Sequence, residues 1–191
     1  MRVGLCGSGS TGKTTIAVAL AEHLGITYVP SVARSVMVDE WGLESELDGA
    51  KLPEHERYQL QHMMFVRRLE VERKVAEFVA DRTTIDHVAY CLMHCWSSMS
   101  AEEIADMLEK TRVAMSQLDV VFFVPSTNVP KRDDEFRNGT GSMREVVDVM
   151  IRGLLDRIDV RYIVVPPGSK AEQFTFVHKH VVLQKRKAVL S

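Results

Sequence analysis

Residues whose types and spacing suit phosphate binding lie near the start of the chain. Gly7-Ser8-Gly9-Ser10-Thr11-Gly12-Lys13-Thr14 fits the pattern GxxxxGK[ST] in full, and Thr15 follows it. In this pattern, glycines let successive backbone N–H groups converge on phosphate oxygens, and the start of the next helix adds its partial positive charge. Lys13 would reach the outer phosphates, and the Thr14 hydroxyl would bind Mg²⁺. The sequence therefore predicts a binding site for ATP, or a related triphosphate, together with magnesium.

The same residues also fit the shorter dinucleotide pattern GxGxxG through Gly7, Gly9 and Gly12. A lysine directly after the last glycine suits the charge of a triphosphate, whereas a dinucleotide site has no need of it. A dinucleotide site also calls for an acidic residue at the end of the second strand, near Val29, and none is there. We therefore favour the phosphate loop over a dinucleotide site or a chance glycine-rich turn.

An acid and a cation follow a later apolar stretch, at Asp81 and Arg82. Asp81 could accept the proton of an acceptor hydroxyl or hold a magnesium-bound water, and Arg82 could hold a substrate or the transferring phosphate. The apolar stretch at 119–124, by contrast, has no acid at its carboxyl end. The alternative interpretation is that Asp81 and Arg82 form a salt bridge with each other.

The least regular stretch, residues 126–142, is rich in polar residues and cations. Lys131, Arg132 and Arg137 lie within it, and Arg144 comes just after it. Phosphoryl transfer needs cations that reach the γ-phosphate while water is excluded. Loops of this length are uncommon without a function. We expect 126–142 to form a lid with Arg137 as its catalytic cation, and an ordinary charged loop is the alternative.

The elements that must position these groups alternate between strand-like and helix-like patterns, which is typical of βαβ units in a mainly parallel sheet. Short apolar runs predict strands, whereas apolar residues at helical spacing with capping residues predict helices. Strands are expected at 2–6, 26–29, 78–81, 119–124 and 161–165, and helices at 13–24, after Ser31, at 53–78, 84–97, 101–116 and 142–157, and around Phe174–Val181. The pattern predicts one α/β domain over residues 1–191.

Composition narrows the classes of function. With a formal net charge of -2 and 46% hydrophobic residues, the chain is expected to be globular and to lack an overall basic field for nucleic acid. It shows neither a membrane-length apolar run nor a signal peptide, so we expect a cytoplasmic protein. Cys91, His94 and Cys95, with His87 nearby, would lie on adjacent helical turns and could bind a metal, although free cysteines are more commonly core residues.

With these residues in view, the chain resembles the AAA-type P-loop family that includes ribosylnicotinamide kinase domains and small bacteriophage kinases of nucleosides or DNA bases. The likeness rests on the loop GSGSTGKTT, on Val32-Ala33-Arg34 and on Asp134–Arg137 after a Val-Pro strand end. Separately, Asp81-Arg82 resembles the acid and arginine of nucleoside and nucleotide kinases. Where family members commonly have Tyr-Ala-Arg-Glu, this chain has Ser35 in place of the acid. The resemblance implies a P-loop NTPase fold with a five-stranded sheet in the order 2-3-1-4-5 and helices on both faces.

The leading hypothesis is an ATP- and Mg²⁺-dependent kinase that transfers the γ-phosphate to a hydroxyl of a nucleoside-type acceptor. That acceptor would be a free nucleoside or nucleotide, or a hydroxymethyl pyrimidine in phage DNA. Lys13, Asp81 and Arg137 would be catalytic, and Thr14 and Asp81 would organise the metal. The acceptor would bind beyond the carboxyl ends of the second and third strands, among Arg34, Asp39, Arg82 and Asp86.

Two other classes of protein remain as alternatives to a kinase. One is an ATPase or GTPase switch or motor, and the other is a nucleotide-binding regulator without turnover. The sequence leaves open the acceptor, the choice between ATP and another triphosphate, and the oligomeric state.

Overall fold

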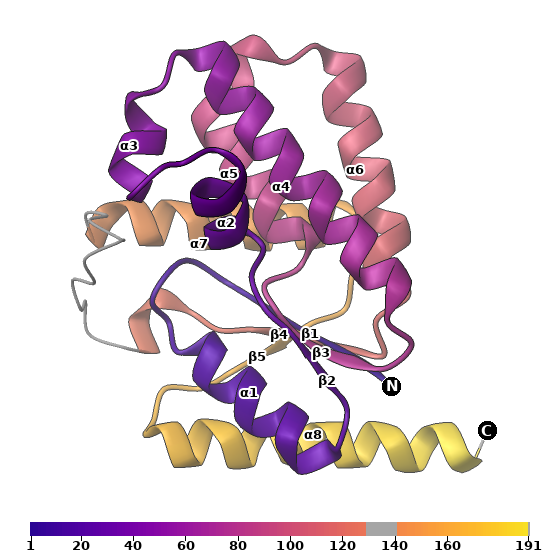
Figure 1. Cartoon of the computed structure of the whole chain (residues 1–191). Helices are drawn as coiled ribbons and strands as arrows, with labels where there is room; N and C mark the ends of the chain where they lie inside the picture. The colour runs from indigo at the N-terminus through magenta and orange to yellow at the C-terminus, as the bar shows by residue number, and fades with distance from the viewer. Residues whose placement is uncertain (129–140, 191) are drawn as a thin grey trace.

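A computed structural model describes residues 1–128 and 141–190 (Figure 1). It contains a five-stranded sheet in the order β2-β3-β1-β4-β5, in which every neighbouring pair is parallel. The strands are β1 (Arg2–Cys6), β2 (Thr27–Val29), β3 (Phe78–Asp81), β4 (Val120–Phe123) and β5 (Ile163–Val164). This sheet confirms the expected α/β P-loop NTPase fold and its strand order.

Helices cover both faces of the sheet. Against one face lie α1 (Lys13–Leu24) and α8 (Lys170–Leu190), and on the other lie α4 (Glu54–Lys74), α5 (Thr84–Cys95), α6 (Ala101–Ser116) and α7 (Gly141–Arg157) (Figure 1). The shorter pieces are α2 (Ala33–Ser35), a π-helical turn η1 (Val36–Glu40), α3 (Glu46–Lys51) and the 3₁₀ turns η2 (Trp96–Ser98) and η3 (Ser126–Asn128). No helix of the described residues is long and apolar enough to cross a membrane.

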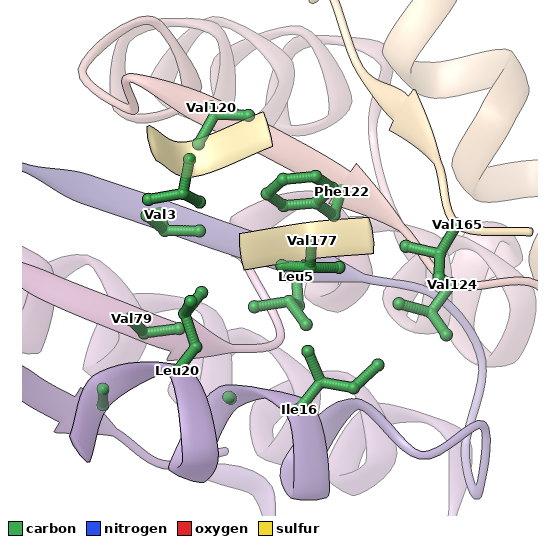
Figure 2. Packing of buried hydrophobic residues seen from close by; sticks show 13 residues of the cluster. Val3, Leu5, Ile16, Leu20, Val79, Val120, Phe122, Val124, Val165 and Val177 are labelled. Atoms are coloured by element: carbon green, nitrogen blue, oxygen red, sulfur yellow. The ribbon is translucent and has the colours of Figure 1, made fainter. Parts of the chain in front are cut away.

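Each face of the sheet has its own apolar layer. Figure 2 shows the layer beneath α1 and α8, which includes Val3, Leu5, Ile16, Leu20, Val79, Val120, Phe122 and Val177. On the opposite face, Cys6, Val121 and Phe123 pack with Ile151 and Leu155 of α7. Successive strand residues point to opposite faces, so strands covered on both faces must be apolar throughout. This explains why the strands are recognisable as continuous apolar runs.

The element boundaries differ from expectation in a few places. The helix expected at 53–78 ends at Lys74, because the chain turns extended at Val75 before β3 begins. β5 is shorter than the predicted 161–165, as is common for a strand at the edge of a sheet. Residues 46–51, for which no helix was predicted, form α3, which begins where the Ser45 side chain accepts a hydrogen bond from the Asp48 backbone N–H at 3.3 Å.

Candidate nucleotide-binding and active site

The phosphate loop connects β1 to the start of α1. Gly7, Ser10 and Gly12 adopt positive φ angles of 137°, 57° and 92°, a region that glycine enters without steric cost. A Cβ at residue 7 would lie 2.4 Å from the Val124 carbonyl oxygen, so only glycine fits there. A pocket at the loop is lined by Ser10, Thr11, Gly12, Lys13, Thr14, Asp81 and Arg82. The structure thus brings the loop together with Asp81, the last residue of β3, and with Arg82, which follows it.

Asp81 and Thr14 are in direct contact within this pocket. Parallel pairing places Asp81 beside Leu5 at the end of β1, and the Thr14 hydroxyl donates to Asp81 Oδ2 at 2.5 Å. The Tyr28 hydroxyl donates to the same oxygen at 3.4 Å. Burial and the Asp81 carboxylate raise the pKa of Tyr28 to about 12, so that hydroxyl keeps its proton at neutral pH.

These oxygens fit a magnesium ion. Mg²⁺ prefers oxygen ligands and is commonly bound by one or two protein oxygens together with waters and substrate phosphates. The Thr14 hydroxyl and the Asp81 carboxylate supply such a set on the wall of the pocket. Lys13 Nζ lies in the loop itself, where it donates to the Ser8 carbonyl oxygen and, at 3.0 Å, to Thr11 Oγ1.

Arg82 is buried and has a strained backbone, with a φ of 72° and 5% of its surface exposed. Its guanidinium lies 5.0 Å from the centroid of the Tyr90 ring, and Nη1 lies 3.8 Å from Asp86 Oδ1. Within the described part of the chain, Nη1 has no hydrogen-bond partner, and the ion pair of Arg82 is with Asp86 rather than with Asp81. The alternative of a mutual Asp81–Arg82 salt bridge is therefore not what the structure contains.

Asp86 has a contact that the sequence did not predict. Its Oδ1 accepts the Gly7 N–H at 2.9 Å, and its Oδ2 accepts the Thr83 N–H at 2.8 Å and the Thr83 hydroxyl at 3.1 Å. Burial raises the pKa of this carboxyl, while the nearby Arg82 and Lys13 act to lower it. Both oxygens of Asp86 are thus committed to the loop and to the cap of α5.

Two further residues that hold the loop were missed at the sequence level. Asp148 Oδ1 accepts the Ser8 N–H at 3.0 Å, and the Tyr90 hydroxyl accepts the Gly9 N–H at 3.2 Å. The sequence does contain a signal for Asp148, because it lies three residues before Ile151 and so on the same, apolar face of the helix. In the structure Asp148 is 8% exposed. An acid on the apolar face of a helix needs a partner.

The remaining expected acceptor residues lie elsewhere. Arg34 on α2 and Asp39 on η1 are exposed, and neither lines the pocket at the loop. Arg137, with Lys131 and Arg132, lies outside the described residues, as does most of the expected lid at 126–142.

The metal site considered as an alternative for Cys91, His94 and Cys95 on α5 finds no support in the structure. Within residues 1–128 and 141–190, no group of three or more His, Cys, Asp or Glu side chains could hold a metal ion. Cys91 and Cys95 are buried core residues, as free cysteines commonly are. Burial, then Arg68 and Arg82, hold the pKa of His87 well below its usual value, so its ring is neutral.

Comparison with known proteins settles the family. A model of the family described as AAA domain matches residues 2–173. The chain belongs to this AAA-domain family. No curated protein sequence matches the chain, so the relatives of this AAA-domain protein are found through structure.

Several solved structures share the fold of this AAA-domain protein at low sequence identity. A deoxyadenosine kinase from M. mycoides with bound dATP superposes with a TM-score of 0.68 at 13% identity, covering 95% of this chain and 98% of that one. The NadR protein in complex with NR gives 0.67 at 15%, covering 94% of this chain but 49% of the longer NadR chain. A shikimate kinase from Acinetobacter baumannii with shikimate gives 0.55 at 16%, covering 99% and 94%.

Proposed function

We propose that this AAA-domain protein is a kinase that uses ATP and magnesium to phosphorylate a hydroxyl of a nucleoside-type acceptor. The observation that carries the proposal is the position of Asp81, which shares one pocket with the phosphate loop and touches the Thr14 hydroxyl at 2.5 Å. Phosphoryl transfer needs bound phosphates, a metal ligand and a proton acceptor close together. The kinases among the solved structures of this fold support the same class of reaction.

The residues of the pocket account for each step of such a reaction. The loop N–H groups and Lys13 hold the phosphates, and Mg²⁺, when bound, neutralises charge on the β- and γ-oxygens. Both hydrogen bonds to Asp81 go to Oδ2. Within the described residues, Oδ1 is thus left to accept a proton. The acceptor oxygen attacks the γ-phosphorus, its proton passes to Asp81, and the bond to the ADP oxygen breaks.

Two arginines are proposed to hold charge during this transfer. Arg82 lines the pocket with its guanidinium near Asp86 and Tyr90, so it can contact the acceptor or the transferring phosphate. Arg137 remains a proposal from the sequence, as a cation over the γ-phosphate. Arg137→Ala should lower kcat far more than it weakens ATP binding, because the contact is made mainly in the transition state. Equal losses in both quantities would contradict this role.

The direct test is transfer of labelled γ-phosphate from ATP to a panel of acceptors. The panel contains nucleosides, nucleotides, and DNA with and without hydroxymethyl pyrimidines. We expect a phosphorylated nucleoside-type product whose formation Asp81→Asn slows strongly and Asp156→Asn, an exposed change on α7, leaves unchanged. Release of inorganic phosphate without any phosphorylated acceptor would instead identify an NTPase, and tight ATP binding without turnover would identify a regulator.

The same assay distinguishes a free acceptor from one in DNA. A base in duplex DNA must leave the stack to be phosphorylated, and its backbone must be held by cations. Transfer to a free nucleoside that is fast and indifferent to salt supports the small-molecule acceptor. Transfer that requires DNA and falls steeply with salt concentration would overturn the small-molecule acceptor and support an acceptor in DNA.

A further inference from the structure

The first three N–H groups of the phosphate loop are accepted by protein side chains. Gly7 donates to Asp86 at 2.9 Å, Ser8 to Asp148 at 3.0 Å and Gly9 to Tyr90 at 3.2 Å. The pocket is lined by the later part of the loop, from Ser10 onward. The loop is therefore divided into a part fixed to the protein and a part that faces the pocket.

Asp148 connects the loop to a segment outside its own helix, whereas the second oxygen of Asp86 accepts from Thr83 at the start of the helix that carries Asp86. Its Oδ1 accepts the Ser8 N–H, and its Oδ2 accepts the Ser126 N–H at 2.6 Å. Ser126 begins η3, the turn that follows β4. One buried carboxylate on α7 thus holds the start of the phosphate loop and the turn after β4, residues that are 118 positions apart in the chain.

Arg144, one helical turn before Asp148, contacts the same two segments through their carbonyl groups. Its Nη2 donates to the Ser126 carbonyl oxygen at 2.9 Å and to the Ser10 carbonyl oxygen at 3.4 Å. Arg144 and Asp148 therefore present a donor and an acceptor to the two segments from one side of α7. The pair fixes both segments relative to α7, which lies on the same face of the sheet as α5 (Figure 1).

We propose that Asp148 is a positioning residue that presets the phosphate loop for a triphosphate by connecting it to α7 and to η3. The inference rests on the proposed function, because the ligand of the loop is taken to be ATP. Binding is strongest when the receiving groups are already in their bound arrangement, since no ordering then opposes it. Asp148 does not line the pocket, so its effect must pass through Ser8 and Ser126.

Charge is what lets one side chain accept from both segments. A carboxylate has two acceptor oxygens, whereas an amide of the same shape has one acceptor oxygen and one NH₂ donor group. In Asp148→Asn, the NH₂ group must face either the Ser8 N–H or the Ser126 N–H. The NH₂ group and that backbone N–H, both hydrogen-bond donors, would then face each other in the buried interior. The segment that carries this N–H would lose its hydrogen bond to α7.

The test measures the affinity of a fluorescent ATP analogue, without acceptor, for Asp148→Asn and for Asp156→Asn. Asp156 lies on the same helix but is exposed, so it controls for the loss of an acidic charge. We expect affinity to fall about ten- to hundredfold in Asp148→Asn and less than twofold in Asp156→Asn. In turnover, KM for ATP should rise while KM for the acceptor and kcat change little. A purely structural role would lower the melting temperature and leave the affinity of the folded protein unchanged.

A second substitution keeps the proposal falsifiable if Asp148→Asn folds poorly. Ser126→Pro removes the N–H that Asp148 Oδ2 accepts, at the first position of a 3₁₀ turn, where the φ of proline is compatible. With that donor gone, the amide of Asp148→Asn can turn its oxygen to Ser8 without opposition. The double variant should therefore bind the analogue more tightly than Asp148→Asn alone. Additive losses, or unchanged affinity in folded Asp148→Asn, would overturn the proposal.

Lys13→Ala separates a failure of this inference from a failure of the proposed function. If Lys13→Ala loses affinity for the analogue while Asp148→Asn does not, the loop binds triphosphate and only the positioning role is wrong. If Lys13→Ala binds as tightly as the wild type, the loop is not the triphosphate site and the proposed function itself is wrong.

Discussion

The layer between the sheet and α1 with α8 and the region around the phosphate loop are both buried, but they differ in composition. The first is held by apolar side chains such as Leu20, Phe122 and Val177. The second contains buried charges, including Asp86 and Asp148, whose oxygens accept loop N–H groups. Apolar burial stabilises in proportion to area, without direction, whereas a buried charge is tolerated only with placed partners. The difference teaches that stability and site geometry depend on separate sets of residues.

The largest effect that would sharpen this comparison is expected from Lys13→Ala. The ammonium group neutralises charge on the outer phosphates, more so as charge shifts in the transition state. Turnover should fall by a few powers of ten, a loss of roughly 4 kcal/mol or more, while the folded structure persists. Single-turnover rates, with a thermal melt as the control for folding, would check this prediction. Near-normal turnover would show that the loop is not part of the active site.

Asp81→Asn should come next. The change keeps the shape of the side chain but removes its negative charge and its ability to take a proton. A fall in kcat of about 10²- to 10⁴-fold is expected, with ATP binding only mildly weakened, because the loop N–H groups still hold the phosphates. An unchanged rate together with a lowered melting temperature would show that Asp81 stabilises the fold and does not act in the reaction.

Leu20→Ala tests the other half of the comparison. Leu20 is fully buried between α1 and the sheet (Figure 2), so the change leaves a cavity in the apolar layer. The free energy of unfolding, measured with urea, should fall by about 2–5 kcal/mol. The kcat/KM of the folded protein should stay near that of the wild type. A parallel loss of kcat/KM well below the unfolding transition would mean that the two regions are not separable.

The smallest expected effect concerns pH. Burial holds the pKa of His87 well below its usual 6.5, so below pH 6.5 the unfolded chain binds a proton that the folded protein does not. Stability therefore falls as pH falls from 6.5 toward the folded-state pKa, at a rate of up to about 1.4 kcal/mol per pH unit. His87→Gln should flatten this part of the unfolding profile in urea. An unaltered slope would show that other groups cause it.

Sequence reasoning located the strands and the loop, because both are local patterns. The apolar runs that form β1, β3 and β4 are continuous, and GxxxxGK[ST] identifies the loop without reference to other segments. The strand order came from the resemblance to a known family, since a local pattern does not state which strands are neighbours. The length of β5 was overestimated and α3 was missed, because the stability of such short elements depends on packing more than on local propensity.

The partners of the loop could not be predicted in the same way. Asp148 lies 140 residues from Ser8, and Asp86 lies 79 residues from Gly7. Nothing in either segment specifies the other, so these contacts become visible only once the fold places α5 and α7 beside the loop. Asp86 was expected to bind the acceptor because it follows β3, yet its position also allows it to accept the Gly7 N–H.

The contacts of Lys13 have a consequence for anion binding. The ammonium group of Lys13 donates to the Ser8 carbonyl oxygen and to the Thr11 hydroxyl. When a triphosphate binds Lys13, it must therefore replace these hydrogen bonds with new ones. The gain in binding free energy is the difference between the two sets of hydrogen bonds. A small anion such as sulfate has the length of a single phosphate group, so it can reach fewer of the loop and helix-start donors at once than a triphosphate and should compete poorly. The loop would then discriminate among anions by the number of hydrogen bonds that each anion can accept, as well as by the charge of the anion.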